Sequence, residues 1–370
     1  MKKLIFIFTI FLIFGCIDDY NPKGIEQVRD LLVIEGCVTE GESVFLFSRS
    51  IGLLDDRSKS NYYINDAKVY VEKDNGERIE GFRSDNGTYT VKNGKFEAGT
   101  KYRLYAVVGG EEYASGFLSP IYTSEIDSIS FTKKQLGAPI SIGVSTHDSS
   151  NQSRYYMWSF EEIWEQKAEL FANYGNLNGY LEYFSLATEK NTFYCWVRDN
   201  SKAVVLGSTA KLSENFIHQK QLKEVSSFNA RFSELYYIKV KQMQIRKEAH
   251  DYYSNINKNI EQTGSIFSPM PSEMRGNIAC LTNPTLPVIG YVEVTSVTEK
   301  DMFRDGQDLH EPLGRGCFLL ATSDPAYAYP EYAYLTYGTT IEYIPYECVD
   351  CRKVLGATKN RPDFWPNDHY

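Results

Sequence analysis

Residues 67–82 read AKVYVEKDNGERIEGF, and this stretch decides the fold class of the first part of the chain. Apolar and polar residues alternate on both sides of Asp74-Asn75-Gly76, with the period of two that is typical of half-buried strands. Asn-Gly between two such runs is a strong hairpin signal, because both turn positions need positive φ. The stretch therefore predicts an antiparallel β-hairpin.

The same turn chemistry recurs on either side of this hairpin. Asn86-Gly87, Asn93-Gly94 and Gly109-Gly110 each separate short alternating runs, and helical periodicity is absent over residues 31–115. About seven short strands at this spacing are typical of a small antiparallel sandwich. We therefore expect a mainly β protein that begins with an Ig-like or prealbumin-like β-sandwich over residues 26–120.

The rest of the chain, residues 121–370, reads as a larger β-rich domain with one main helix. Its strands are longer, and Arg154–Glu162 carries the aromatic residues that favour a sheet. Lys247–Gln262 predicts the helix, because its apolar residues recur at helical spacing and Gly264 follows as a stop signal. A tail rich in cysteine and tyrosine ends the domain.

A short apolar segment near the N-terminus predicts a secretory signal peptide. Lys2 and Lys3 precede Leu4–Phe14, an apolar run broken only by Thr9. As a helix this run is about 16 Å long, whereas the hydrocarbon core of a bilayer is about 30 Å thick. The segment is therefore too short to span a membrane and is typical of a signal-peptide core.

The end of this segment indicates a lipid anchor. Ile13-Phe14-Gly15-Cys16 resembles the lipobox of bacterial lipoproteins, which implies a signal peptide over residues 1–15. Cys16 is then acylated with palmitate-type chains and begins a lipidated tether over residues 16–25. Two or more acyl chains anchor a protein stably. The alternative is an ordinary signal peptide with an incidental cysteine.

Two acidic residues directly after the anchor indicate which side of the outer membrane the protein faces. Asp18 and Asp19 resemble the surface-export signal of certain Gram-negative lipoproteins. The resemblance implies an outer-membrane protein, lipid-anchored and facing the cell exterior. The alternative is an outer-membrane lipoprotein that faces the periplasm.

Charge and composition narrow the class of partner. The chain has 370 residues, with 39 Lys+Arg against 48 Asp+Glu and a net charge of -9. An acidic balance argues against nucleic acid, because phosphate contacts need a basic face. The 42% apolar and 24% charged residues are close to a globular average and exclude long disorder.

Six further cysteines are disulfide candidates, because six is even and an exported protein meets an oxidising compartment. Sequence does not choose among the fifteen connectivities that six cysteines allow. A zinc site at Cys348-x-x-Cys351 is the alternative, disfavoured because a second C-x-x-C is missing, and we expect no metal and no cofactor. The candidates are Cys37, Cys195, Cys280, Cys317, Cys348 and Cys351.

The sequence carries no familiar catalytic motif: HExxH, GxSxG, the P-loop and GxGxxG are all missing. Glu161-Glu162 is an acidic pair at the end of the predicted strand Arg154–Glu162. Neighbours on a strand point to opposite faces, so the two carboxylates cannot act together, although one of them can be buried in an ion pair. We therefore expect no enzymatic activity.

Aromatic residues of the tail are the best binding candidates. Tyrosine offers a large rigid face and one hydrogen-bonding tip at low entropic cost, which suits interfaces and ligand platforms. The alternative is that these rings only cover the sheet as a disulfide-pinned flap. The candidates are Tyr327, Tyr329, Tyr332, Tyr334, Tyr337 and Trp365.

Several segments, in the same order and spacing over most of the chain, resemble one family of outer-membrane lipoproteins of unassigned function. Cys37 and Gly356-Ala357 depart from its pattern. Its members are typically encoded beside TonB-dependent receptors, so the resemblance implies a TonB-dependent outer-membrane transporter as partner and no catalytic residue. The matching segments are 32–36, 156–162, 193–196, 237–242, 275–278, 288–291, 348–351 and 361–365.

We therefore expect a non-catalytic accessory or binding subunit of a TonB-dependent nutrient-uptake receptor. A stand-alone surface binding or adhesion lipoprotein is the alternative, and an enzyme acting on a surface polymer is a third class.

Overall fold

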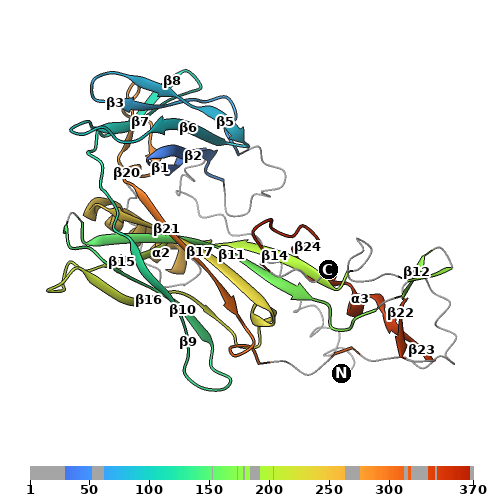
Figure 1. Ribbon diagram of the computed structural model, residues 1–370. Coiled ribbons are helices and arrows are strands. Elements are labelled where there is room, and N and C mark those ends of the chain that lie inside the picture. Colours follow the sequence, from blue (N-terminus) through green and yellow to red (C-terminus); the bar gives the residue numbers. More distant parts are fainter. Residues whose placement is uncertain are drawn as a thin grey trace, which may run out of the picture.

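Two stacked β-sandwiches and a small projecting sheet make up the protein (Figure 1). Strands account for 51% and helices for 8% of the computed structural model, which confirms the mainly β prediction. No described helix is long and apolar enough to cross a membrane. The structure describes residues 30–51, 62–151, 153–172, 174–177, 180–183, 192–202, 204–262, 276–311, 316–317, 332–337 and 340–366.

The upper sandwich of Figure 1 contains most of the strands expected over residues 26–120. The turn at Asp74-Asn75-Gly76 joins two of them, which confirms the predicted hairpin. Gly76 adopts a φ of 89°, but Asn75 has no positive φ, so the expectation that both turn positions need positive φ is wrong for this turn. One sheet holds β1 (Leu32–Val38), β2 (Gly41–Arg49), β5 (Phe82–Asp85) and β6 (Thr88–Gly94). The other holds β3 (Lys68–Lys73), β4 (Arg78–Glu80), β7 (Tyr102–Val108) and β8 (Glu111–Ser115).

Alternation of side chains builds the core between these two sheets. On β2, Ser43, Phe45 and Phe47 are fully buried, whereas Val44, between Ser43 and Phe45, is 50% exposed. Val69 and Leu104 meet the two phenylalanines from the opposite sheet. Each fully buried side chain of this size contributes about 1.5–3 kcal/mol to stability, so the inward faces hold the two sheets together.

Three short strands from far along the chain complete the upper sandwich. They are β18 (Ile278–Cys280), β19 (Val288–Ile289) and β20 (Glu293–Val294). β19 and β20 run parallel to β1, and β18 pairs with β8. Sequence periodicity places these residues in the second domain, and the structure corrects this. Two- and three-residue strands are defined by their partners and not by any local pattern, so the sequence carries no signal of where they pair.

The lower sandwich packs a three-stranded sheet against a six-stranded one. Large side chains on alternate positions of β11, among them Tyr156, Trp158 and Phe160, fill the space between the sheets. The smaller sheet has the order β16 (Phe216–Val225), β10 (Ile140–His147), β9 (Ile126–Lys133). The larger has the order β21 (Val297–Asp305), β17 (Leu235–Ile245), β11 (Tyr155–Lys167), β14 (Tyr194–Asn200), β24 (Ala357–Thr358), with β15 (Val205–Ser208) also on β11.

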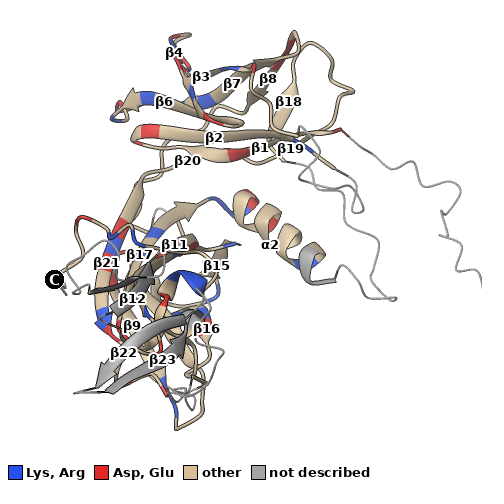
Figure 2. Ribbon diagram, turned by 90° about the vertical axis from the view of Figure 1, so that its right-hand side faces the viewer, with Lys and Arg blue, Asp and Glu red and all other residues tan. Residues whose placement is uncertain are grey.

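Helix α2 (Lys247–Gln262) has the bounds predicted from sequence and lies between the two sandwiches (Figure 2). Ala249 and Tyr252 are buried on its inner face. Tyr252 packs against Tyr291, which follows β19. The helix therefore contacts the upper sandwich as well as the lower sheet.

Two chain crossings between the sandwiches lie side by side. Ile121, between β8 and β9, forms a parallel bridge with Thr295, which follows β20. Thr123 donates a backbone hydrogen bond to the Ser296 hydroxyl and a side-chain bond to the Ser296 carbonyl. The predicted boundary near residues 118–124 thus falls on a hydrogen-bonded connection.

The projecting four-stranded sheet joins a middle segment to the tail. It has the order β13 (Tyr180–Tyr183), β12 (Tyr174–Leu177), β22 (Tyr332–Tyr337), β23 (Thr340–Pro345). The short helices α3 (Tyr346–Val349) and η3 (Cys351–Lys353) follow β23, and η1 (Ala230–Phe232) precedes β17.

Candidate functional site

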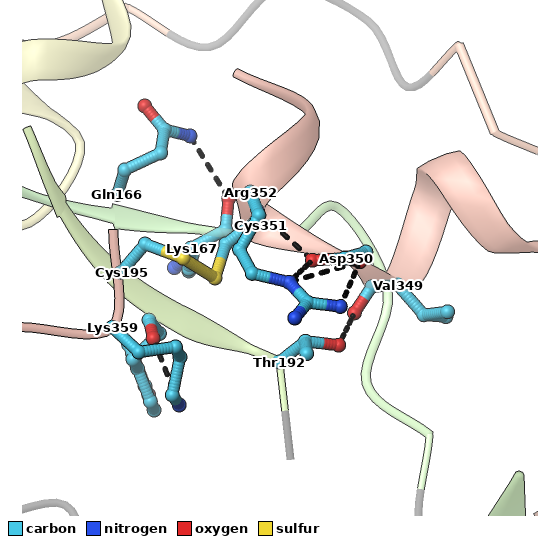
Figure 3. The surroundings of a disulfide bond; sticks show 10 residues. Gln166, Lys167, Thr192, Cys195, Val349, Asp350, Cys351, Arg352 and Lys359 are labelled. Carbon is cyan, nitrogen blue, oxygen red and sulfur yellow. Dashed lines mark hydrogen bonds and ion pairs between the residues drawn. A yellow bond between two sulfur atoms is a disulfide. The ribbon is translucent and has the colours of Figure 1, made fainter. Parts of the chain in front are cut away.

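Two disulfides fasten the tail to the lower sandwich and confirm four of the six candidate cysteines. Cys195 on β14 bonds Cys351 at the start of η3, and both residues are fully buried (Figure 3). Cys317 bonds Cys348 in α3. Disulfides of the tail cysteines, expected from sequence, are therefore present, with a connectivity that the sequence did not decide.

Hydrogen bonds reinforce the first disulfide on both sides (Figure 3). The Thr192 hydroxyl donates to the Val349 carbonyl, and the Cys351 amide donates to the Thr192 carbonyl at 2.8 Å. Asp350 is 3% exposed, caps η3 by accepting from the Arg352 amide, and pairs with the Arg352 guanidinium at 2.7 Å. The disulfide and the two hydrogen bonds of Thr192 thus fasten the tail to the sheet, and the Asp350–Arg352 pair stabilises η3 within the tail.

Cys37 and Cys280 carry free thiols, so the disulfide prediction is wrong for these two residues. On β1, Cys37 lies opposite Glu293 of β20, and on β18, Cys280 lies opposite Tyr113. Neither strand position faces another cysteine. An even cysteine count does not reveal this, because pairing depends on which strands are neighbours.

Tyrosine positions form one row across the projecting sheet. Tyr183 lies opposite Tyr174, Tyr174 opposite Tyr334, and Tyr334 opposite Tyr343. The side chain of Tyr183, on the outermost strand of this order, is 60% exposed.

The structure places three of the tyrosine candidates in one strand, because Tyr332, Tyr334 and Tyr337 belong to β22. Tyr327 and Tyr329 lie outside the described residues, as do the lipidation candidate Cys16 and the export residues Asp18 and Asp19.

Trp365 is a packing residue, which corrects its prediction as a binding candidate. It is 2% exposed and lies in a cluster with Trp196 and Tyr237 on the outer face of the six-stranded sheet. Its ring also meets that of Phe303 edge-on at 5.3 Å. From the sequence alone, a tryptophan near a chain end can serve either packing or binding. The burial of Trp365 against the six-stranded sheet shows that it packs.

The acidic pair divides between two environments, as strand geometry predicts. Glu162 is fully buried and pairs with Lys223 and Arg231, and it accepts a hydrogen bond from the Tyr236 hydroxyl at 2.6 Å. Glu161 points to the opposite, exposed face and pairs with Lys241. The two carboxylates therefore do not form an acid–base pair.

Arg246 joins the two sandwiches at the end of β17. Its guanidinium pairs with Glu293 of β20, its amide donates to Glu293 at 2.9 Å, and its second guanidinium nitrogen donates to the Ser119 carbonyl. The Glu293 side chain is 1% exposed, and burial raises its pKa. The ion pair fixes the junction where both chain crossings and α2 meet.

Next to this junction lies a cavity of about 400 Å³ between β1, the segment after β19, α2 and the six-stranded sheet. Apolar and aromatic side chains dominate its wall, among them Met157, Met243, Tyr252, Ile256 and Tyr291. Ligand sites are typically concave, apolar, 300–1,000 Å³ in volume and often located between domains. This cavity matches all four criteria.

The phenols and the thiol in this wall are kept neutral by their surroundings. Burial raises the pKa of Tyr252 and of Tyr291 to about 12, and that of Tyr253 further. Burial and the charge of Glu293 raise the pKa of the Cys37 thiol to about 12. At neutral pH these groups donate hydrogen bonds and do not act as bases or nucleophiles, so the wall is suited to binding.

Sequence reasoning missed this cavity because its wall comes from six separate parts of the chain. Three of the resemblance segments, 32–36, 156–162 and 288–291, do supply part of it. Their neighbourhood also explains a glycine pair: a Cβ on Gly276 would lie 1.5 Å from the Gly290 carbonyl oxygen. The signal of this cavity in the sequence was thus the set of short glycine-containing segments that match the family in order.

In the described part of the chain, no three His, Cys, Asp or Glu side chains gather into a group that could hold a metal ion. A family model described as a domain of unknown function, DUF4249, matches residues 17–301. The chain belongs to this family. No curated protein matches the chain.

Proposed function

We propose that this DUF4249 protein is an outer-membrane lipoprotein, exposed at the cell surface, that serves as a non-catalytic binding subunit of a TonB-dependent nutrient-uptake receptor. The disulfide between Cys195 and Cys351 is the main support for a location outside the cytoplasm, because such bonds form and persist in oxidising compartments. The lipobox resemblance at Cys16 supports the anchor, and Asp18 and Asp19 support the outward orientation.

A binding role fits the chemistry of the cavity better than a catalytic one. General acid–base catalysis works best with groups whose pKa lies near the working pH. The wall instead holds phenols and a thiol with raised pKa, together with methionine and aliphatic side chains. Such a wall supplies contact area and hydrogen-bond donors.

The anchor would allow a weak interface with the receptor to suffice. Acyl chains on Cys16 confine the protein to the plane of the membrane, so binding to a receptor in the same membrane takes place at high effective concentration. The edge of the projecting sheet at Tyr183 is our candidate for the receptor-facing surface, since Tyr183 is 60% exposed and exposed tyrosine suits interfaces.

Co-purification from membranes in mild detergent tests the partnership. The full-length chain should recover a TonB-dependent transporter. Cys16→Ser should leave the membrane fraction and lower that recovery by about a hundredfold, because the effective concentration is lost. Cys280→Ser is the matched control, since Cys280 is a free thiol inside the upper sandwich. Repeated recovery of the intact protein without any such transporter would refute the proposal.

Protease treatment of intact cells tests the orientation. A surface-exposed protein should be cleaved before the cells are lysed, whereas resistance until lysis would show that it faces the periplasm. The stand-alone binding lipoprotein remains the second candidate. The cavity favours this second candidate, because a binding site built within one chain needs no transporter. Recovery of a surface-exposed protein without a receptor would support it.

A further inference from the structure

The cavity at the junction has opposite charges at its rim. Glu35 on β1 and Lys202 after β14 both line it, and both are exposed. Within the described residues, neither side chain forms an ion pair or a hydrogen bond. The charge of Glu35 also acts on the phenols of Tyr252 and Tyr253, which places it beside the aromatic part of the wall.

The interior offers few groups to a polar ligand. The Tyr253 hydroxyl already donates to the Tyr291 carbonyl at 3.2 Å, and the Asn257 amide donates to the Val204 carbonyl at 3.3 Å. A sugar brings many hydroxyls that this wall would leave unpaired, and each unpaired buried polar group is costly. A multiply charged anion would be repelled by Glu35. An apolar body with one positive and one negative end satisfies both the wall and the rim.

We propose that this cavity binds a short apolar peptide in its zwitterionic form. The ammonium of the peptide pairs with Glu35, its carboxylate pairs with Lys202, and its apolar side chains lie among Tyr252, Tyr291 and Met243. The volume of about 400 Å³ suits a peptide of a few residues. This inference goes beyond the proposed partnership, since it concerns a site within one chain.

Calorimetric titration of the full-length protein in lipid nanodiscs tests the proposal, with the dipeptide Leu-Phe as probe. Leu-Phe should bind, whereas N-acetyl-Leu-Phe and Leu-Phe amide should each bind about fivefold more weakly, which is the usual contribution of one exposed ion pair. Octanoate has an apolar body and a carboxylate but no ammonium. It should therefore bind more weakly than Leu-Phe.

Paired variants locate the two ends of the peptide. Glu35→Gln should weaken Leu-Phe about fivefold and leave N-acetyl-Leu-Phe unchanged. Lys202→Gln should weaken Leu-Phe equally and leave Leu-Phe amide unchanged. Glu125→Gln and Lys68→Gln neutralise exposed residues outside the cavity lining and should change nothing.

A filling variant locates the apolar body. Ile256 lines the cavity from α2, so Ile256→Trp places an indole in the space and should abolish binding of Leu-Phe. If Ile256→Trp disturbs folding, Glu35→Gln and Lys202→Gln still test the site, because both residues are exposed. The proposal is overturned if Leu-Phe fails to bind at millimolar concentration, if octanoate binds more tightly, or if the rim variants bind as the unaltered protein does. Because the titration uses this chain alone, its failure would leave the receptor partnership untouched.

Discussion

Replacing Glu162 tests whether the lower sandwich depends on a buried charge cluster. The carboxylate is fully buried and offsets Arg231 at 2.9 Å and Lys223, whose side chains are 13% and 27% exposed. Glu162→Gln keeps the volume but removes the negative charge and turns an NH2 donor toward other donors. Breaking a buried pair from one side costs about 3–5 kcal/mol, and since Lys223 can regain water we expect about 3 kcal/mol.

Equilibrium unfolding in urea, followed by tryptophan fluorescence, measures this loss, because Trp158 and Trp164 lie in the same core. The midpoint should fall without a change in the slope of the transition. Glu161→Gln is the matched control: its carboxylate is exposed and pairs only with surface lysine, so it should cost less than about 1 kcal/mol. Equal losses in the two variants would refute the reasoning.

A second arm separates the charge from the packing. In Glu162→Gln, Lys223 and Arg231 keep only the more distant Asp199 carboxylate, at 3.7 and 3.8 Å. If the loss arises from this missing negative charge, then replacing Glu162, Lys223 and Arg231 together by apolar residues of similar size should recover much of the stability. A triple variant less stable than Glu162→Gln would show that the hydrogen bonds themselves hold the sheets, and the charge account would be wrong.

Three further predictions concern pH, the tail and the junction. The folded pKa of Tyr252 is about 12 against an ordinary 10.0, so its contribution to stability is full below pH 10 and disappears as pH rises through 12; a flat unfolding midpoint over this window would contradict it. Replacing Cys195 and Cys351 together by serine should cost up to about 5 kcal/mol in urea unfolding, from the entropy of a closed loop this long, and an unchanged midpoint would argue against that model. Gly290→Ala should destabilise the upper sandwich by about 3 kcal/mol or more, because a Cβ would lie 2.2 Å from the Ile34 carbonyl oxygen. At Gly109, which also has positive φ but open space, alanine should cost only about 1–2 kcal/mol in the same unfolding assay.

Local signals in the sequence predicted local structure well. The Asn75-Gly76 turn, the alternating runs around it and the helix over Lys247–Gln262 all depend on interactions between residues close in the chain. The split of Glu161 and Glu162 between two faces followed from strand geometry alone.

Features that depend on distant partners could not be predicted in the same way. The pairing of Leu32 with Val288 leaves no periodic signal, because β19 has only two residues. The disulfide connectivity and the free thiol of Cys37 follow from which strands become neighbours. The cavity at the junction also depends on distant partners, since its wall forms only when the two sandwiches and α2 have come together.

The late arrival of β18, β19 and β20 has a consequence for folding and for any attempt to cut the protein. A fragment ending at residue 120 would expose the hydrogen-bonding edges of β1 and β8, and bare edges invite aggregation. The edges of β1 and β8 can be paired only by residues 278–294, and such non-local pairing is slow. The exported chain should therefore need protection from aggregation until these three strands have paired.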